Sequence, residues 1–135
     1  TLAIAADETR HLLWRLRDGK ELSNGLAHDP RLLICLLIGT NDLGNGGHTP
    51  EMVAAGIIAV ARELLAGARG KLLLNALLPR GDKFSLTRHC PPLCKSSGAP
   101  YDSFAPLLAH VNTILQSAML HLAAEFNRRV RFIDC

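Results

Sequence analysis

The feature that most constrains the fold is a continuous apolar run from Leu32 to Ile38. Its seven residues show no alternation of apolar and polar positions, which is typical of a parallel strand buried on both faces. A polar, glycine-rich turn, Gly39 to Gly47, follows directly. Thr49 and Pro50 then have the residue types of a helix N-cap and of a first helical position. A buried strand that leads through a turn into a helix indicates an α/β fold.

The rest of the chain repeats this alternation. Further strands are predicted at Leu2–Ala5, Lys71–Leu78 and Val130–Ile133, and Asp7 is the predicted cap of the first helix. The helical patterns between the strands have these predicted buried positions: Leu12, Leu13, Leu16, Val53, Ile57, Val60, Leu64, Phe104, Leu108, Val111, Leu115, Met119, Leu122 and Phe126. The order β-α-β-α-β-α-β predicts a parallel sheet with helices on both faces.

Sites in such sheets lie at the carboxyl ends of the strands. In this chain those ends correspond to residues 5–9, 39–48 and 79–90. Residues 80–103 are rich in Gly, Pro and polar residues, so we predict a long loop there. Loops of this length are uncommon inside a domain, which indicates an insertion or a functional segment.

Length and charge exclude several classes of protein. The 135 residues fit a single domain, and 15 Lys and Arg against 12 Asp and Glu give a net charge of +3. These charges are scattered along the chain, so no nucleic-acid partner is expected. The longest apolar run is far shorter than the ~18 residues of a membrane span, and no secretory signal opens the chain. We therefore expect a cytoplasmic protein without a membrane span.

The cysteines point to no metal centre. Cys35 lies in an apolar run and is expected to be a small buried residue. Cys90 and Cys94 flank a Pro-Pro-Leu turn beside His89, and no second pair stands at metal-ligand spacing. Reduced thiols are the default expectation for a cytosolic protein, although the spacing leaves a disulfide open.

The Gly39–Gly47 turn is the sharpest candidate for chemistry. A phosphate-binding loop needs Lys and Ser or Thr where Asn45 and Gly46 stand, and the dinucleotide fingerprint G-x-G-x-x-G also fails. A nucleotide-binding α/β domain is therefore the less favoured alternative. Asn41 offers an amide N–H at the end of a strand, where it could stabilise an oxyanion. Taken alone, its position fits hydrogen bonding within the turn better.

Three segments resemble one known family, and they follow one another along this chain in the same order as in that family. Ile38-Gly-Thr-Asn-Asp-Leu-Gly44 looks like the G-x-N-D block of the SGNH (GDSL-type) esterases. Asp7-Glu-Thr-Arg-His-Leu-Leu-Trp-Arg-Leu-Arg17 is similar to D-T-T-R-H-x-L-W-R-L in the branch of platelet-activating factor acetylhydrolase catalytic subunits. Leu77-Leu-Pro-Arg-Gly81 and the Val111–Asn112 pair also have counterparts there. The resemblance covers residues 2 to 134.

This resemblance implies a flavodoxin-like three-layer α/β/α sandwich and hydrolysis of carboxylic esters without a cofactor. In the family a Ser attacks the ester, a His takes its proton, and an Asp three residues earlier orients that His. The Ser N–H, a Gly N–H and an Asn side chain hold the oxyanion. Asn41 corresponds to that Asn. The Gly position falls on Ala6, which keeps the N–H but resists a positive φ, so its role as a donor is weaker.

The 135 residues contain neither the G-D-S block nor the D-x-x-H block. By resemblance the four predicted strands are the second to fifth of the order 2-1-3-4-5. The central first strand is therefore missing, and the Leu32–Ile38 strand is expected to expose an apolar edge. The chain is interpreted as the middle portion of an SGNH-type domain: a fragment, a truncated product, or a degenerate copy kept for binding. The resemblance implies a small ester substrate for the complete enzyme, and a homodimer or a WD-repeat protein as partner. The alternative from another class is a non-catalytic interaction module.

Overall fold

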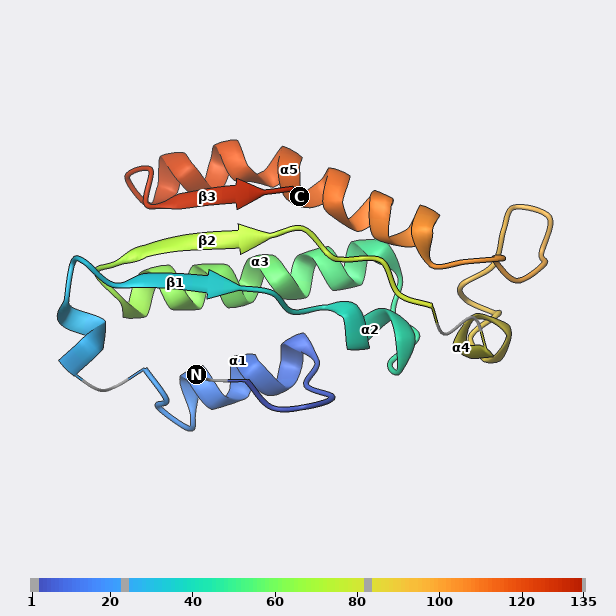
Figure 1. Cartoon of the computed structure of the whole chain (residues 1–135), viewed down its shortest axis with the longest axis horizontal. Helices are drawn as coiled ribbons and strands as arrows, with labels where there is room; N and C mark the ends of the chain where they lie inside the picture. Colours follow the sequence, from blue (N-terminus) through green and yellow to red (C-terminus); the bar gives the residue numbers. More distant parts are fainter. Residues whose placement is uncertain (1–2, 23–24, 82–83, 135) are drawn as a thin grey trace.

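A three-stranded parallel sheet organises the molecule. The computed structural model describes residues 3–22, 25–81 and 84–134. Strands β1 (Leu33–Leu36), β2 (Lys71–Asn75) and β3 (Val130–Ile133) pair in the order β1-β2-β3 (Figure 1). The prediction of an α/β fold with a parallel sheet is confirmed. β3 has its predicted bounds, whereas β1 and β2 are shorter than the apolar runs that predicted them.

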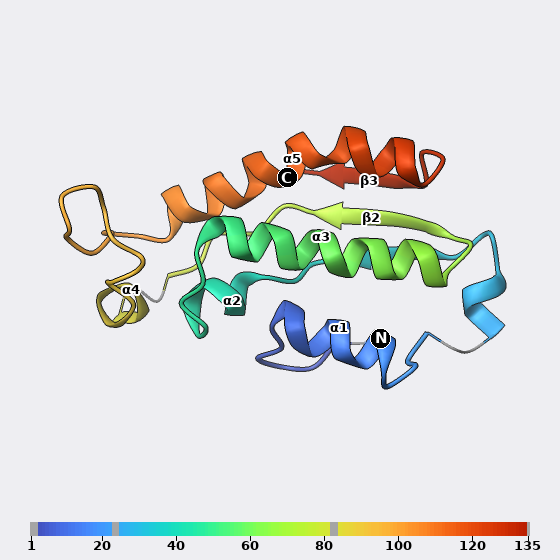
Figure 2. The same cartoon turned by 180° about the vertical axis from the view of Figure 1, so that it is seen from behind.

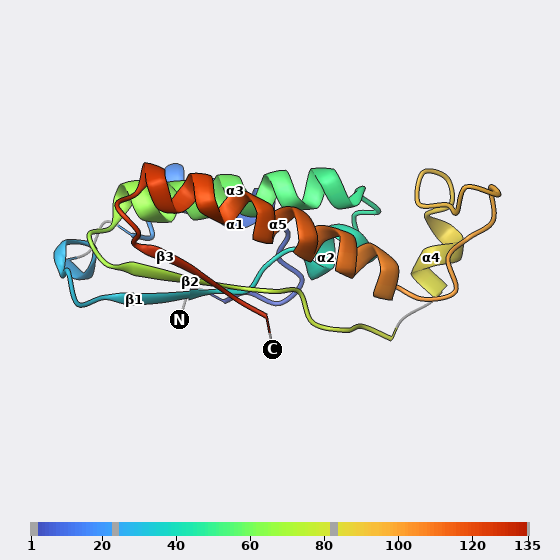
Figure 3. The same ribbon diagram turned by 90° about the horizontal axis from the view of Figure 1, so that it is seen from above.

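The three long helices lie on one side of this sheet. The helices are α1 (Thr9–Arg17), α2 (Thr40–Gly44), α3 (Pro50–Gly67), α4 (Phe84–Arg88) and α5 (Ala105–Glu125), with a 3₁₀ turn η1 (Gly25–His28). Figure 2 shows α3 between α1 and α5, and Figure 3 shows all three above the strands. Every predicted core position on these helices is buried or packs against the core. Hydrophobic burial therefore fixes the helices to one face of the sheet.

The opposite face of the sheet is open in the described part of the chain. Leu33 is 53% and Leu37 51% exposed, and Cys35 between them is also exposed. The predictions that Leu32–Ile38 is buried on both faces and that Cys35 is buried are wrong. The reason is that no helix among the described residues covers the face to which these side chains point. The three-layer sandwich stays a prediction.

The predicted strand Leu2–Ala5 is not observed. Leu2 lies outside the described residues, and Ala3 to Ala5 run as coil into a turn at Ala5–Ala6. A strand needs a neighbour for its backbone hydrogen bonds. Among the described residues, a groove separates this segment from the free edge of β1, so the segment has no strand to pair with.

Two predicted helix starts have different outcomes. Thr49 caps α3 as predicted, with its hydroxyl accepting the Met52 N–H at 3.4 Å. Asp7 does not cap α1, whose N-cap is Glu8, and the Nδ1 atom of His11 accepts the Glu8 N–H at 3.1 Å. The prediction for Asp7 is wrong because its carboxylate pairs with Arg15 instead.

Residues 80–103 are more ordered than the predicted long loop. They contain α4 and a disulfide between Cys90 and Cys94, with 5.0 Å between the two Cα atoms. Leu86 and Leu93 are buried in the core. The default expectation of reduced thiols is wrong for this pair, and the disulfide that the spacing left open is formed, because the turn brings the two cysteines within bonding distance. That this segment is an insertion stays a prediction.

Helix α5 is the one described helix long and apolar enough to cross a membrane, with a mean hydropathy of 1.2. Length and composition carry little weight here, because its apolar stripe packs against α3 and β3.

Asn112 further ties α5 to the chain beyond β2. Its side chain accepts the Leu77 N–H at 2.8 Å and donates to the Leu77 carbonyl at 3.1 Å.

Candidate functional site

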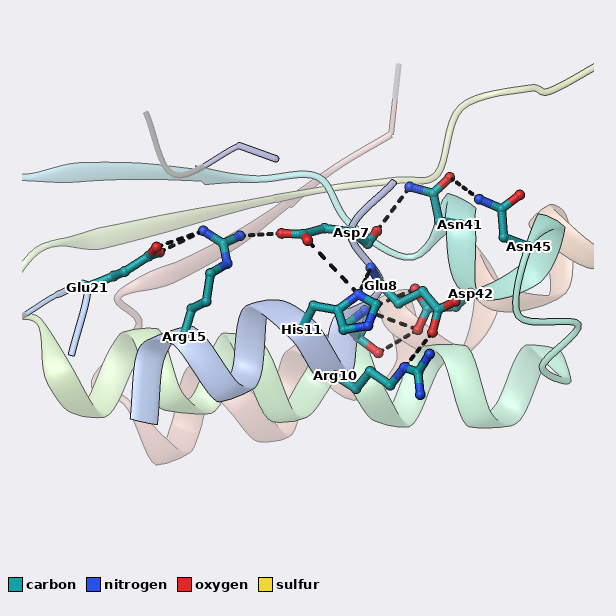
Figure 4. A network of polar contacts seen from close by, with 10 residues as sticks. Asp7, Glu8, Arg10, His11, Arg15, Glu21, Asn41, Asp42 and Asn45 are labelled. Carbon is teal, nitrogen blue, oxygen red and sulfur yellow. Dashed lines mark hydrogen bonds and ion pairs between the residues drawn. The ribbon is translucent and has the colours of Figure 1, made fainter. Parts of the chain in front are cut away.

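The candidate site is the contact between the N-terminal turn and α2, at the carboxyl end of β1. Gly39 is the N-cap of α2 and has a φ of +115°, a conformation that only glycine adopts without strain. Asn41 follows in the first turn, and its Nδ2 donates to the Asp7 carbonyl at 3.0 Å (Figure 4). The structure thus brings the predicted oxyanion side chain against the segment that contains Ala6.

Ala6 has an unusual backbone conformation for a residue with a side chain. Its φ is +66°, in the left-handed region that favours glycine. The resemblance placed a family glycine at this position and predicted that alanine would resist such a φ. The exposed Ala6 adopts it nevertheless, and its neighbour Asp7 presents a carbonyl to Asn41. The roles of Ala6 and Asn41 as oxyanion donors remain proposals.

A buried carboxylate holds the two segments together. Asp42 is 2% exposed and accepts the Thr9 hydroxyl at 2.5 Å and the Thr9 N–H at 3.1 Å. Gly56 on α3 makes room for this contact, because a Cβ there would overlap the Thr9 side chain. Hydrogen bonds that involve a charged group are the strong ones, so this pair sets the position of Asn41 relative to Ala6.

A second charged cluster fixes the other side of the N-terminal turn. Arg15 is buried on α1, pairs with the Asp7 carboxylate and contacts Glu21 at 2.7 Å. Burial by itself lowers the pKa of Arg15. Hydrogen bonds and charges from Glu21 and Asp7 raise this pKa by more than burial lowers it, so the pKa of Arg15 lies above its usual value. Arg15 therefore stays charged and keeps the Asp7 side chain away from Asn41.

A groove of about 340 Å³ runs from these residues along the free edge of β1. One wall is the continuous stretch 34–41, which ends at Asn41. The other wall comes from the N-terminal segment and α1, and includes Ile4, Leu12 and Arg15. The groove borders the edge of β1 that faces away from β2. Among the described residues, no strand pairs with the backbone N–H and C=O groups of this edge.

The three segments predicted to carry function meet at this end of the sheet. Residues 5–9 contact 39–48 through Asn41 and Asp42, and residues 79–90 contact the same turn through Arg80 and His89. Thr9, Asp42, Arg15 and Arg80 were not predicted as site residues from the sequence. Thr9 and Asp42 stand 33 positions apart, and no spacing pattern links them.

Several serine and histidine side chains away from this site make local contacts. The hydroxyls of Ser103 and Ser117 bond to nearby backbone, and His110 lies 3.6 Å from Glu51. Within the described ranges, no group of three His, Cys, Asp or Glu side chains is placed to hold a metal ion.

Curated relatives of this chain are named platelet-activating factor acetylhydrolase IB subunits. The alpha2 subunit of Gallus gallus is 41% identical over 81 residues, which are 59% of this chain and 32% of that protein. The Homo sapiens alpha2 subunit is 40% identical with the same coverage. The Homo sapiens alpha1 subunit is 37% identical over 81 residues, 58% of this chain and 31% of that protein.

The match is partial. The chain spans about a third of the length of the curated relatives it matches. No family model matches the chain, and no solved structure matches it. The comparisons therefore show a likeness to acetylhydrolase subunits over part of their length.

The backbone of Ala6 gives a first testable prediction. Ala6→Gly should raise the free energy of unfolding by about 0.5–1 kcal/mol, because glycine adopts the positive φ without strain. Ala5→Gly is the matched control and should lower stability, because the φ of Ala5 is ordinary. Urea unfolding measures both. Equal destabilisation by the two substitutions would contradict the strained conformation of Ala6.

Proposed function

We propose that this chain forms the oxyanion-bearing central part of an SGNH-type carboxylic ester hydrolase that acts on small acetyl esters in the cytoplasm. The observation that carries the proposal is the position of Asn41, whose amide lies against the Ala6–Asp7 turn at the end of β1. The likeness to relatives named acetylhydrolase subunits supports the acetyl ester as substrate.

The proposed chemistry assigns two donors to this chain. A Ser supplied from outside residues 1–135 would attack the ester carbonyl. A His would accept its proton and an Asp would orient that His, and both would likewise come from outside residues 1–135. Negative charge then develops on the carbonyl oxygen. The Ala6 N–H and the Asn41 amide would stabilise this charge. One hydrogen of Asn41 Nδ2 is held by the Asp7 carbonyl, which leaves the other for the oxyanion.

We further propose that the groove along β1 receives the first strand of a flavodoxin-like sandwich. In the strand order 2-1-3-4-5 this strand lies beside the third, which corresponds to β1. The free edge of β1 and the uncovered Leu33 and Leu37 support the proposal. A parallel strand in the groove would end near Asn41, where the nucleophile is needed.

A chimera tests this function. Residues 1–135 replace the corresponding segment of the Gallus gallus alpha2 subunit, within which 81 residues align with this chain. The remaining segments of that subunit would supply the nucleophile and its partners. The chimera should hydrolyse an aryl acetate, whereas the isolated chain should not exceed background. The same chimera with its nucleophilic serine replaced by alanine is the control. A folded chimera without activity, or turnover by the isolated chain that Asn41→Ala abolishes, would contradict the proposal.

The open face of the sheet favours a second candidate function, a non-catalytic interaction module. Leu33, Leu37 and Leu78 are each more than half exposed, and large exposed apolar groups mark interaction surfaces. The relatives are named as subunits, which supports a protein partner; the family resemblance suggests a second copy or a WD-repeat protein. A Leu33→Lys, Leu37→Lys variant should lose self-association in sedimentation experiments if a second copy binds there. Unchanged sedimentation would exclude that partner for this face.

A further inference from the structure

The turn that carries Asn41 is also held by Arg80, which comes from the segment after β2. Arg80 donates to the Thr40 carbonyl and lies 3.3 Å from the Thr40 hydroxyl. Its guanidinium stacks over the ring of the buried Phe104, with 4.8 Å to the ring centroid. Gly44 makes this approach possible, because a Cβ there would overlap the guanidinium. Arg80 therefore fixes the first residue of α2.

His89 holds the other end of the same turn. Its Nε2 lies 3.1 Å from the Gly44 carbonyl, which only accepts hydrogen bonds, so this contact is a hydrogen bond in the tautomer that has its proton on Nε2. The imidazole fits against Gly47, where a Cβ would overlap the ring. Beyond Gly44, the backbone folds back on Asn41. The N–H groups of Asn45 and Gly46 donate to the Asn41 carbonyl at 2.8 and 3.0 Å.

The position of His89 depends on the 89–94 loop. The Leu93 N–H donates to the His89 carbonyl at 2.8 Å, and the Leu93 side chain is buried. The disulfide between Cys90 and Cys94 closes this loop directly after His89. Both cysteines are half-buried, so a reductant in solution can approach them. The disulfide, His89 and the Asn41 turn thus form one continuous chain of contacts.

We propose that the Cys90–Cys94 disulfide is a redox switch that controls, through His89, how firmly the turn carrying Asn41 is held. A dithiol reductant supplies two electrons and two protons: the S–S bond breaks, two thiols form, and the reductant becomes a disulfide. Reduction frees the 89–94 loop and releases His89 from Gly44. Arg80 keeps its hold on Thr40. The functional meaning of this loosening rests on the proposed role of Asn41.

Hydrogen–deuterium exchange of the full chain tests the switch. Oxidised protein is compared with protein reduced by a dithiol, and mass spectrometry confirms the gain of two hydrogens. Loss of the His89 contact should speed exchange at the Asn45, Gly46 and His48 amides by about five- to tenfold. Amides of α3 and β2 should exchange at unchanged rates, since the hydrogen bonds that protect them do not involve the 89–94 loop.

Three variants separate this mechanism from a general loosening. The double variant Cys90→Ser, Cys94→Ser should show the fast rates with or without reductant, and so should His89→Ala. Cys35→Ser should keep the full redox response. Unchanged exchange at 45–48 after confirmed reduction would overturn the proposal, and so would equal acceleration in α3 and β2. Because exchange needs no turnover, an inactive chimera with an intact redox response would overturn only the proposed function.

Discussion

Asn41→Ala should lower the kcat of the chimera by about 10²–10³ and leave its unfolding transition in place. This is the usual effect of removing one preorganised oxyanion donor. The Asn41 side chain is half-buried. Among the described residues it donates to the Asp7 carbonyl at 3.0 Å and accepts a long hydrogen bond from Asn45 at 3.5 Å, so its removal should affect the rate far more than the fold.

Asn45→Ala is the matched control for this experiment. Asn45 lies on the same turn and is exposed, and its side chain contacts the Asn41 side chain through the long 3.5 Å hydrogen bond. The substitution leaves the backbone hydrogen bond from Asn45 to Asn41 in place. Loss of the Asn45 side chain should change kcat by less than about threefold, because this side chain donates nothing to the reacting atoms. A chimera in which both substitutions have the same small effect would show that Asn41 does not face the developing charge.

Thr9→Val should lower the free energy of unfolding of the chain by about 2–3 kcal/mol. The substitution keeps the shape of the side chain and removes the hydroxyl that donates to the buried Asp42 carboxylate at 2.5 Å. Hydrogen bonds to charged groups contribute about 1.5–3 kcal/mol, and a buried carboxylate that loses a donor also keeps its cost of desolvation. Against a typical total of ~5–15 kcal/mol, this is a large fraction.

Thr113→Val provides the comparison. The Thr113 hydroxyl also donates a hydrogen bond, to the Ala109 carbonyl at 2.9 Å, but it lies on the exposed side of α5. Water can replace that bond, so the cost should stay below about 0.5 kcal/mol. Urea unfolding of both variants measures the difference. Equal costs would show that Asp42 does not depend on Thr9.

The sequence predicted those helices and strands whose positions depend on residues only a few places apart. Thr49 and Pro50 predicted the start of α3, because capping and a fixed φ act within a few residues. The segment Val130–Ile133, Val-Arg-Phe-Ile, predicted β3 with its observed bounds. The core positions on α3 and α5 followed from the helical spacing of their apolar residues.

The features that sequence reasoning missed depend on contacts across the fold. The pairing of Thr9 with Asp42 joins two elements far apart in the chain, and no periodicity predicts it. Cys35 looked buried because its neighbours are apolar, yet a strand has two faces and only one is covered in the described residues. The Cys90–Cys94 disulfide depended on a turn geometry that spacing alone left open.

The most direct test of the central claim is a crystal structure of the chimera trapped with a methylphosphonate ester. Such a reagent bonds covalently to the nucleophilic serine and places a charged oxygen where the oxyanion forms. We expect Asn41 Nδ2 and the Ala6 N–H to lie about 2.7–3.1 Å from that oxygen. An oxygen held by other donors, with Asn41 bonded to the Asp7 carbonyl alone, would contradict the assignment of this chain as the oxyanion-bearing part of an esterase.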